Sequence, residues 1–78
     1  MQAVITNLAN DEKDTSNTII TIEYRDDEGN VLSSEDINSP ITETSEDVTK
    51  RIKSTLMVFE QKYKKQTELA VLLEKPIE

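Results

Sequence analysis

Several residue types on which many enzymes depend are missing from this sequence of 78 residues. It contains no cysteine, no histidine and no tryptophan, and it has one glycine. Without cysteine there is no disulfide framework and no thiolate metal site, and without histidine the commonest metal ligand and neutral-pH base is absent. A single glycine excludes both glycine-rich phosphate-binding motifs. We therefore expect no enzymatic activity, no catalytic residue, no bound metal and no cofactor.

Long hydrophobic runs are lacking as well. No apolar stretch approaches the ~20 residues that a helix needs to span a bilayer. Residues 1–4 lack the basic and apolar regions that open a secretory signal peptide. Since a chain without cysteine also suits a reducing compartment, we expect a cytoplasmic protein that does not associate with membranes.

The apolar residues that are present recur in clusters. They make up 35% of the chain, which is less than in an average globular protein, yet Ile19, Ile20 and Ile22 stand close together. A disordered chain would lack such clusters. A chain of this length has room for one small domain, which buries only about 60% of the surface of its unfolded chain. We therefore predict a single domain of marginal stability over residues 1–78.

The first part of the chain has the pattern of β-strands. Residues 2–8 suit a short strand, and residues 9–17 are polar and are predicted as a loop. The next stretch alternates strictly, which places Ile22 and Tyr24 on one face. The only glycine then lies in a polar turn, where a left-handed residue is needed, and an extended pattern resumes. We predict a β-hairpin over residues 18–34.

A helix is predicted in the second half. Residues 35–44 contain Pro40 and are expected to form an edge strand or an anchored loop that leads to this helix. Thr44 or Ser45 can cap it, so it begins near residue 45. Apolar residues then recur at helical spacing, namely Val48, Ile52, Leu56, Phe59 and Tyr63. Residues 66–78 either continue the helix or form an extra strand, and their strong helix formers favour the helix.

These elements predict an α+β fold. We expect a small antiparallel sheet of two to four strands with the long C-terminal amphipathic helix packed across one face. The predicted core combines one face of the strands with the apolar stripe of the helix and comprises Ile5, Ile20, Ile22, Tyr24, Val31, Val48, Ile52, Leu56, Phe59 and Tyr63.

Charge is unevenly distributed along the chain, whose net charge is −7. Residues 1–47 hold twelve acidic and two basic residues, a net charge of −10. Residues 48–78 hold seven basic and four acidic residues, a net charge of +3. Such an asymmetry indicates an interaction surface.

The abundant acids raise two chemical hypotheses that the sequence disfavours. Paired-carboxylate catalysis needs one acid in an apolar pocket, but these acids cluster in turns and on solvated strand faces. A calcium-binding loop with Gly29 at its sixth position would place Tyr24 at the first ligand position, where an oxygen ligand is required. A solvated surface and a plain hairpin turn are the better interpretations.

Two groups of residues are predicted to bind a partner. The first is acidic, is expected to gather at one end of the hairpin, and comprises Asp26, Asp27, Glu28, Glu35 and Asp36. The second lies on the basic back of the helix, where contact with another subunit or partner competes with a simple solvated face, and comprises Met57, Val58, Lys62 and Lys65. Direct binding of nucleic acid is not expected, because the net charge opposes phosphate and few aromatic residues remain for stacking.

The leading hypothesis is a non-enzymatic protein-binding module whose acidic surface docks on a partner protein with a basic surface. In size, charge and hairpin-then-helix layout the chain resembles the small acidic virus-encoded inhibitors that block restriction or CRISPR nucleases by imitating nucleic acid. The resemblance implies a phage or mobile-element inhibitor of a nuclease, and it assigns no residue a role.

The alternative is a homo-oligomeric structural or accessory protein. In that case the acidic hairpin of one copy would meet the basic helix face of the next, or the helices would pair through Met57 and Val58.

Overall fold

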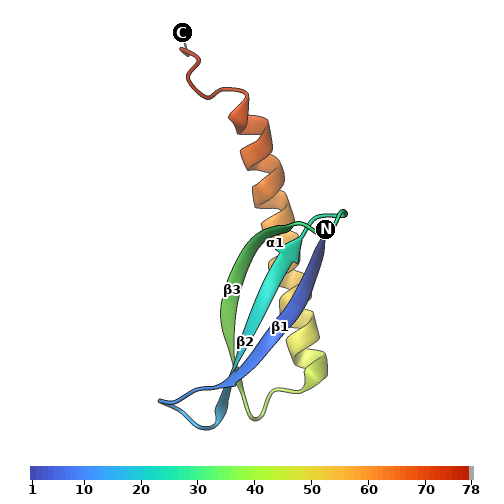
Figure 1. Cartoon of the computed structure of the whole chain (residues 1–78), viewed down its shortest axis with the longest axis vertical. Helices are drawn as coiled ribbons and strands as arrows, with labels where there is room; N and C mark the ends of the chain where they lie inside the picture. The colour runs from blue at the N-terminus through green and yellow to red at the C-terminus, as the bar shows by residue number, and fades with distance from the viewer. Residues whose placement is uncertain (78) are drawn as a thin grey trace.

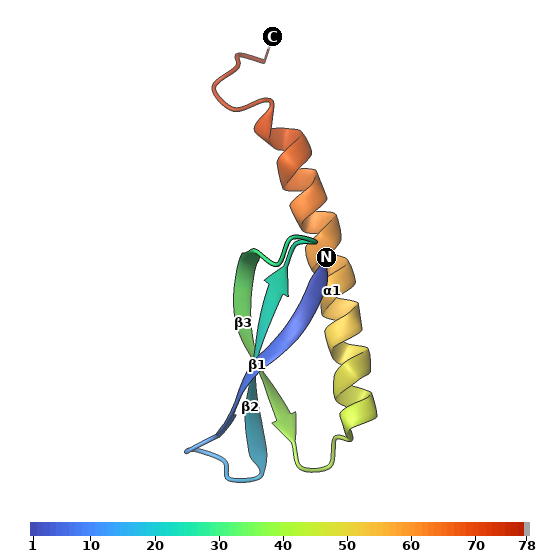
Figure 2. The same ribbon diagram turned by 45° about the vertical axis from the view of Figure 1, so that its right-hand side comes forward.

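The computed structural model describes residues 1–77 and consists of three strands followed by one helix (Figure 1). The strands are β1 (Gln2–Asn10), β2 (Asn17–Arg25) and β3 (Val31–Pro40), and they form an antiparallel sheet in the order β1-β2-β3. The helix α1 (Ser45–Ala70) lies across one face of this sheet (Figure 2). The α+β fold with a single C-terminal helix is therefore as predicted, and the sheet has three strands.

The strands extend further than the sequence predicted. β1 reaches Asn10 because its last residues still pair with the start of β2, so the polar loop shortens from 9–17 to 11–16. The hairpin covers residues 17–40 rather than 18–34, and β3 ends on Pro40. Proline is compatible with this position because β3 is an edge strand, whose outward amides need no partner in the sheet.

The turn between β2 and β3 is held by backbone hydrogen bonds and by one carboxylate. The Gly29 amide donates to the Asp26 carbonyl and the Asp26 amide donates to the Asn30 carbonyl, each over 3.0 Å. Gly29 adopts a φ of +86°, which confirms the predicted need for a left-handed residue in this turn.

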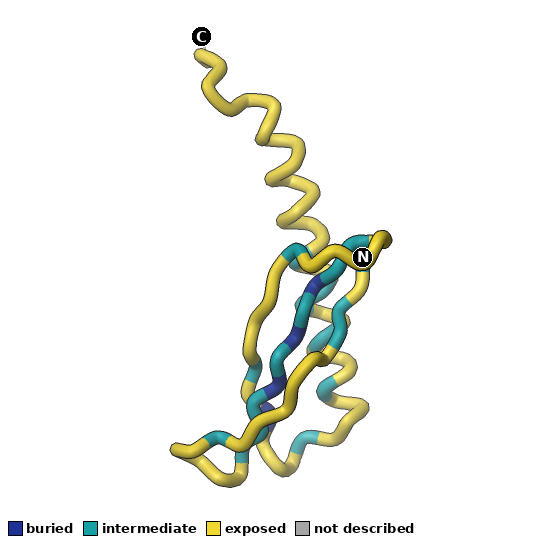
Figure 3. Tube along the Cα trace, viewed as in Figure 1, coloured by how far each residue is buried: buried dark blue, intermediate teal, exposed yellow. Residues whose placement is uncertain are grey.

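The core lies along β2. Ile20, Ile22 and Tyr24 are its buried apolar residues, and Ile22 has no exposed surface. Figure 3 shows that burial follows this central strand, whereas β1, β3 and most of the helix are exposed. The side chains that cover the three residues are partly buried and comprise Ala3, Ile37, Val48, Ile52, Leu56 and Phe59.

Three residues of the predicted core are exposed. Ile5 lies on the edge strand β1 and is 46% exposed, because β1 has a neighbouring strand on one side only. Val31 pairs with Arg25 after a register shift, which turns it away from the face that α1 covers. Tyr63 is 41% exposed, and its ring stacks on that of Phe59, with centroids 6.1 Å apart, rather than on the sheet core. Ala3 and Ile37 pack against the core instead, although the sequence analysis did not include them.

The helix begins with a capping box. The Thr44 hydroxyl accepts from the Asp47 amide over 3.1 Å, and the Asp47 carboxylate accepts from the Thr44 amide over 3.2 Å. Residues 66–70 continue the helix and turns follow at 71–74. No strand is present between residues 66 and 77, so the predicted continuation of the helix holds as far as residue 70. Glu78, the last residue of the segment left open, lies outside the described residues. Within residues 1–77, no helix is long and apolar enough to cross a membrane.

Candidate functional site

The β2–β3 turn carries the first three predicted site residues. Asp26 acts within the turn, because its carboxylate accepts from the amides of Glu28 and Asn30 over 3.0 and 2.9 Å. The hydrogen bond from the Asn30 amide lowers the pKa of Asp26 below its ordinary value. Asp27 is almost fully exposed, and its carboxylate lies 2.7 Å from the amino group of Met1. Asp27 and Glu28 thus present their charge to solvent, while Asp26 shapes the turn.

Glu35 and Asp36 lie in the middle of β3 and point to opposite faces of the sheet. Glu35 is on the face that α1 covers, where it accepts a hydrogen bond from the Tyr24 hydroxyl. Asp36 is on the open face, where it accepts from the Thr21 hydroxyl over 2.7 Å. Because Glu35 is four residues beyond the start of β3, it lies about 13 Å along the strand from the turn.

The five acidic residues are therefore not gathered at one end of the hairpin. The structure brings together only Asp26, Asp27 and Glu28, because a strand of alternating side chains cannot present consecutive residues on the same face. Acidic residues at the opposite end of the sheet, in the loop between β1 and β2, were not among the predicted site residues. They are Asp11, Glu12 and Asp14.

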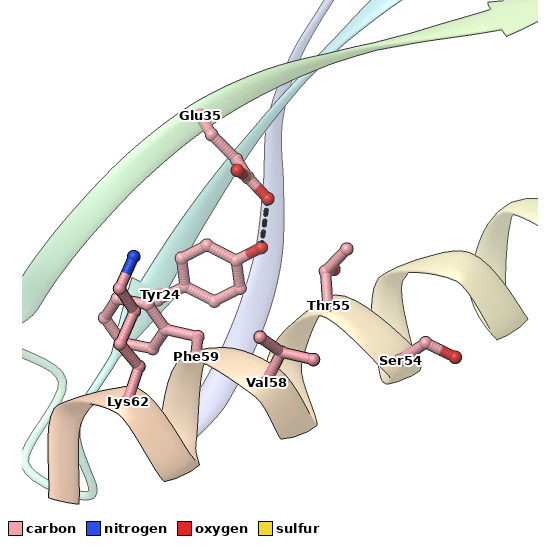
Figure 4. Close-up of a pocket in the computed structure, with 7 residues that line it drawn as sticks. All are labelled: Tyr24, Glu35, Ser54, Thr55, Val58, Phe59 and Lys62. Atoms are coloured by element: carbon pink, nitrogen blue, oxygen red, sulfur yellow. Dashed lines mark hydrogen bonds between the residues drawn. The ribbon is translucent and has the colours of Figure 1, made fainter. Parts of the chain in front are cut away.

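An open groove of about 340 Å³ runs between β3 and α1. Figure 4 shows Glu35 reaching from β3 to the Tyr24 hydroxyl, with Val58 and Lys62 of α1 on the opposite wall. The groove thus combines one predicted acidic residue with two residues of the predicted helix contact. Its remaining lining residues are Tyr24 and Phe59, which were predicted only as core residues, and Ser54 and Thr55, which were not predicted at all.

Two patterns in the sequence could have identified this groove. Alternation places Tyr24 and Glu35 on the same face of neighbouring strands. Spacing of three and four residues places Thr55, Val58 and Lys62 on one side of the helix. What was missing was the side of the sheet on which this helical stripe would lie.

The Tyr24 side chain is held by Phe59 on one side and by Glu35 on another. Its ring stacks on that of Phe59 with centroids 4.5 Å apart and an angle of 11° between the planes. Burial, and then the hydrogen bond to Glu35, raise the pKa of the Tyr24 hydroxyl above its ordinary value. The Thr55 hydroxyl in the same groove donates to the Ile52 carbonyl over 2.9 Å. The hydroxyls of Tyr24 and Thr55 thus form a polar wall of the groove, and both already donate hydrogen bonds within the protein.

The four predicted helix residues do not form one patch. Val58, Lys62 and Lys65 follow each other at helical spacing, but only the first two line the groove. Met57 lies roughly 100° around the helix from Val58 and faces away from it. Both Met57 and Val58 are well exposed, at 63% and 64%.

Charge separates between the sheet and the helix. Residues 1–44 hold ten acidic and two basic residues, a net charge of −8, whereas α1 holds six basic and four acidic residues, a net charge of +2. One of the two bases, Arg25, is paired with Glu23 over 2.7 Å. The sheet and its loops are therefore acidic on their exposed surface, and the helix is weakly basic.

One ion pair joins the sheet to the helix. Arg51 donates to both carboxylate oxygens of Glu43 over 2.7 and 2.8 Å and to the Asn38 carbonyl over 3.1 Å. Ser39 adds a hydrogen bond of 2.6 Å to the same carboxylate. The bonds from Arg51 and Ser39 lower the pKa of Glu43 below its ordinary value. Arg51 therefore anchors the helix and is not part of a free basic surface.

A second groove, of about 570 Å³, lies on the other side of the helix, between α1 and β1. Its walls are mainly apolar and come from Ala3, Val4 and Ile5 of β1 and from Ile52 and Leu56 of α1. The structure therefore leaves a groove on each side of the helix, because one helix is too narrow to cover three strands.

Neither groove resembles a metal site. Within residues 1–77, no three acidic side chains come together in a way that could hold a metal ion. The carboxylates that do have partners are bound by hydroxyls, backbone or side-chain amides, arginines, a lysine or the terminal amine, as for Asp36, Asp26, Glu43, Glu46 and Asp27. The surfaces offer charge, hydrogen-bond donors and apolar area, which are the means of recognising another molecule.

Comparison with known proteins gives no relative: no family model, no curated protein and no solved structure matches this chain.

Proposed function

We propose that the protein is a binding module, without catalytic activity, whose acidic sheet side docks on a basic site of a partner protein. The observation that carries this proposal is the separation of charge: a net charge of −8 on residues 1–44 beside a helix of net charge +2. Opposite potentials across an interface accelerate encounter and select the partner.

The finer proposal is that the basic site is the nucleic-acid groove of a nuclease, and that the protein is a phage or mobile-element inhibitor. A strand of nine residues is about 30 Å long, and over that length one strand of B-DNA carries about nine phosphate charges. The sheet and its loops hold ten acidic residues, and the eight that are not paired with an arginine are close to that number. They lie in both end loops, on both faces and on the edge strand β3, so a groove that holds one nucleic-acid strand is the surface they fit.

The test is displacement of DNA from purified nucleases. Fluorescent duplex and single-stranded DNA are bound to a panel of restriction and CRISPR nucleases at low salt, and the protein is titrated in. We expect release of DNA from at least one nuclease, an effect that weakens as salt rises. Absence of release across the panel would overturn the nuclease proposal.

Charge-reversal variants test the acidic surface itself. Asp27→Lys combined with Glu28→Lys removes two exposed charges of the turn and spares Asp26, which the turn needs. The matched control, Glu68→Lys with Glu74→Lys, changes the net charge equally but lies at the exposed C-terminal end of the helix and beyond it. We expect the turn variant alone to lose affinity; equal losses in both would show that only net charge matters.

A second candidate is head-to-tail assembly, in which the acidic hairpin of one copy meets the basic helix face of the next. The same separation of charge favours it, and a head-to-tail contact forms rings or open filaments. Light scattering after size exclusion would show oligomers that dissociate as salt rises from about 0.1 to about 1 M. A mass that does not change with salt would exclude this assembly.

A further inference from the structure

The structure is more open than a chain of its size should be. Its radius of gyration is 16.2 Å, whereas a compact domain of this length has one of about 11.5 Å. It exposes 6322 Å² of surface, whereas a compact protein of 8.9 kDa exposes about 4,800 Å². The excess is about 1,500 Å², and part of it comes from the end of α1, which extends beyond the sheet (Figure 1). The total is larger than the roughly 800 Å² that each partner buries in a standard interface.

The edge strand β1 lacks the charges and the proline that commonly protect edge strands, and its one irregularity is the register shift between Ile5 and Asn7. Edge strands usually carry charges or proline, which prevent pairing with another sheet. β3 follows this rule, with Glu35 and Asp36 at its centre and Pro40 at its end. β1 contains neither a charged residue nor a proline over Gln2–Asn10. Of the two edges, only β1 is therefore open to a further strand.

Exposed apolar side chains lie beside this open edge. Ile5 and Leu8 are 46% and 65% exposed. A register shift between Ile5 and Asn7 puts both on the face that α1 covers, opposite Ile22 and Ile20. Ile5 also lines the groove between β1 and α1, and Leu8 extends this apolar surface along β1.

We infer that β1 is a dimerisation edge, on which β1 of a second copy pairs antiparallel to form a continuous six-stranded sheet with both helices on one face. This interface is separate from the acidic surface of the proposed function, so either proposal can fail alone.

The absence of charged side chains on β1 favours a second copy of this chain over a charged partner protein at this edge. A chain with a net charge of −7 repels its own copies over most of its surface, and β1 is the strand on which that repulsion is smallest because it carries no charged side chain. Lys53 is the charged residue that lines the adjoining groove. Its long stem can cover apolar surface while the ammonium group remains in water.

The chain's own C-terminal segment is excluded as the occupant by length. α1 rises about 27 Å between Ile52, which lines the groove, and Ala70, where the helix ends. The apolar residues Val71 to Leu73 lie within three residues of Ala70, and three residues of extended chain span at most about 11 Å. Ile77 could reach the Leu56 end of the groove, about 21 Å from Ala70, only if residues 71–77 were fully extended, whereas residues 71–74 form turns.

The side chains define the register of the pair. A two-fold axis between Thr6 and Asn7 places Ile5 of one copy opposite Leu8 of the other. Val4 then faces Ala9 of the second copy on the open side of the sheet. In this register each apolar residue meets another on its own face, as β-sheet pairs require.

The first test is the mass in solution. Light scattering after size exclusion should give twice the chain mass of 8.9 kDa at about 0.1 M and about 1 M salt alike, because the contact is not ionic. A monomer at near-millimolar concentration would overturn the inference, and so would an oligomer that high salt dissociates.

Leu8→Lys places a charge on the proposed edge, and Val31→Lys is the matched control on the exposed surface of β3. We expect Leu8→Lys to halve the mass while far-UV circular dichroism stays that of a folded chain, and Val31→Lys to remain a dimer. A folded Leu8→Lys dimer would overturn the inference.

Cysteine cross-linking tests the register and decides the case if Leu8→Lys does not fold. The chain has no cysteine of its own, and directly opposed residues of antiparallel strands lie close enough for a disulfide. A mixture of the single variants Ile5→Cys and Leu8→Cys should form a disulfide-linked dimer under mild oxidation, whereas each variant alone should not. Equal or absent cross-linking in all three samples would contradict the proposed pairing.

Discussion

Tyr24 and Glu35 are diagonal neighbours on adjacent strands, and the tyrosine hydroxyl donates a hydrogen bond to the carboxylate. Tyr24 is buried, whereas Glu35 is exposed and lines the groove between β3 and α1. The pair therefore closes the core on the β3 side with a polar contact, and the ring of Phe59 stacks beneath it. Among residues 1–77, no corresponding hydrogen bond joins β1 to α1, and the walls of the second groove are mainly apolar.

Removing the Tyr24 hydroxyl should weaken the domain modestly. Tyr24→Phe keeps the ring and its stacking but deletes the donor, and the exposed Glu35 carboxylate can turn to water. We expect a loss of about 1 kcal/mol in the free energy of unfolding, measured by urea denaturation. Tyr63→Phe, at an exposed ring, is the control and should change stability by less than about 0.5 kcal/mol.

The raised pKa of Tyr24 predicts alkaline destabilisation. Because burial and the bond to Glu35 favour the neutral hydroxyl in the folded state, the stabilisation is complete below the unfolded value of about 10. It is lost as pH rises through the higher folded pKa. In the Tyr63→Phe variant, where Tyr24 is the remaining tyrosine, phenolate absorbance should rise with a midpoint above about pH 10. A midpoint below that value would contradict the burial of the hydroxyl.

The elements of the fold were predictable because their signals are local. Alternation defined β2, a capping residue and a helical stripe defined α1, and Gly29 marked the turn. The exposure of Ile5 and Val31 was not predictable in this way. It depends on how far one helix extends over three strands and on a register shift, and both are tertiary features.

The candidate site was predictable only in part for the same reason. Asp26, Asp27 and Glu28 are adjacent in sequence, so their proximity follows from the turn itself. Glu35 and Asp36 are also adjacent, but strand geometry sends them to opposite faces. The role of Arg51 depends on Glu43 meeting the first turns of the helix, which charge counting along the chain cannot reveal.

Acid should destabilise the protein below about pH 4. The pKa values of Asp14, Asp26 and Glu43 are lowered, chiefly by hydrogen bonds from Ser16, Asn30 and Arg51 respectively. A lowered folded pKa gives stability that is present above the unfolded value and lost as pH falls through the folded one. Melting temperatures measured between pH 7 and pH 3 should therefore decline at the acid end.

The variant Glu43→Gln isolates the ion pair in this decline. It should lower the melting temperature at neutral pH, and its loss on acidification should be smaller than that of the original protein. Glu12→Gln, in the exposed loop between β1 and β2, is the control and should follow the original curve. Parallel curves for all three proteins would show that Arg51 and Glu43 do not contribute to acid sensitivity.

The effect of replacing Gly29 on stability should depend on its backbone conformation and not on the space around it. An added Cβ at Gly29 would meet no atom within 4 Å, so Gly29→Ala suffers only from its φ of +86°. The expected loss is about 1 kcal/mol in the free energy of unfolding. Gly29→Asn should lose less, because asparagine adopts left-handed conformations more readily. Equal losses would indicate a steric cause instead.

The small core makes Ile22 the position where truncation should have the largest effect. Ile22 is fully buried between α1 and its neighbours on β1 and β3, so Ile22→Ala leaves a cavity and should lower the free energy of unfolding by about 3 kcal/mol. A domain of this length has about 4 to 12 kcal/mol in total, so a quarter or more of its stability is expected to disappear. Ile41→Ala removes the same atoms at a site that is 82% exposed and should change little. Urea denaturation of both variants measures the difference, and similar losses would mean that α1 does not cover β2 as the structure has it.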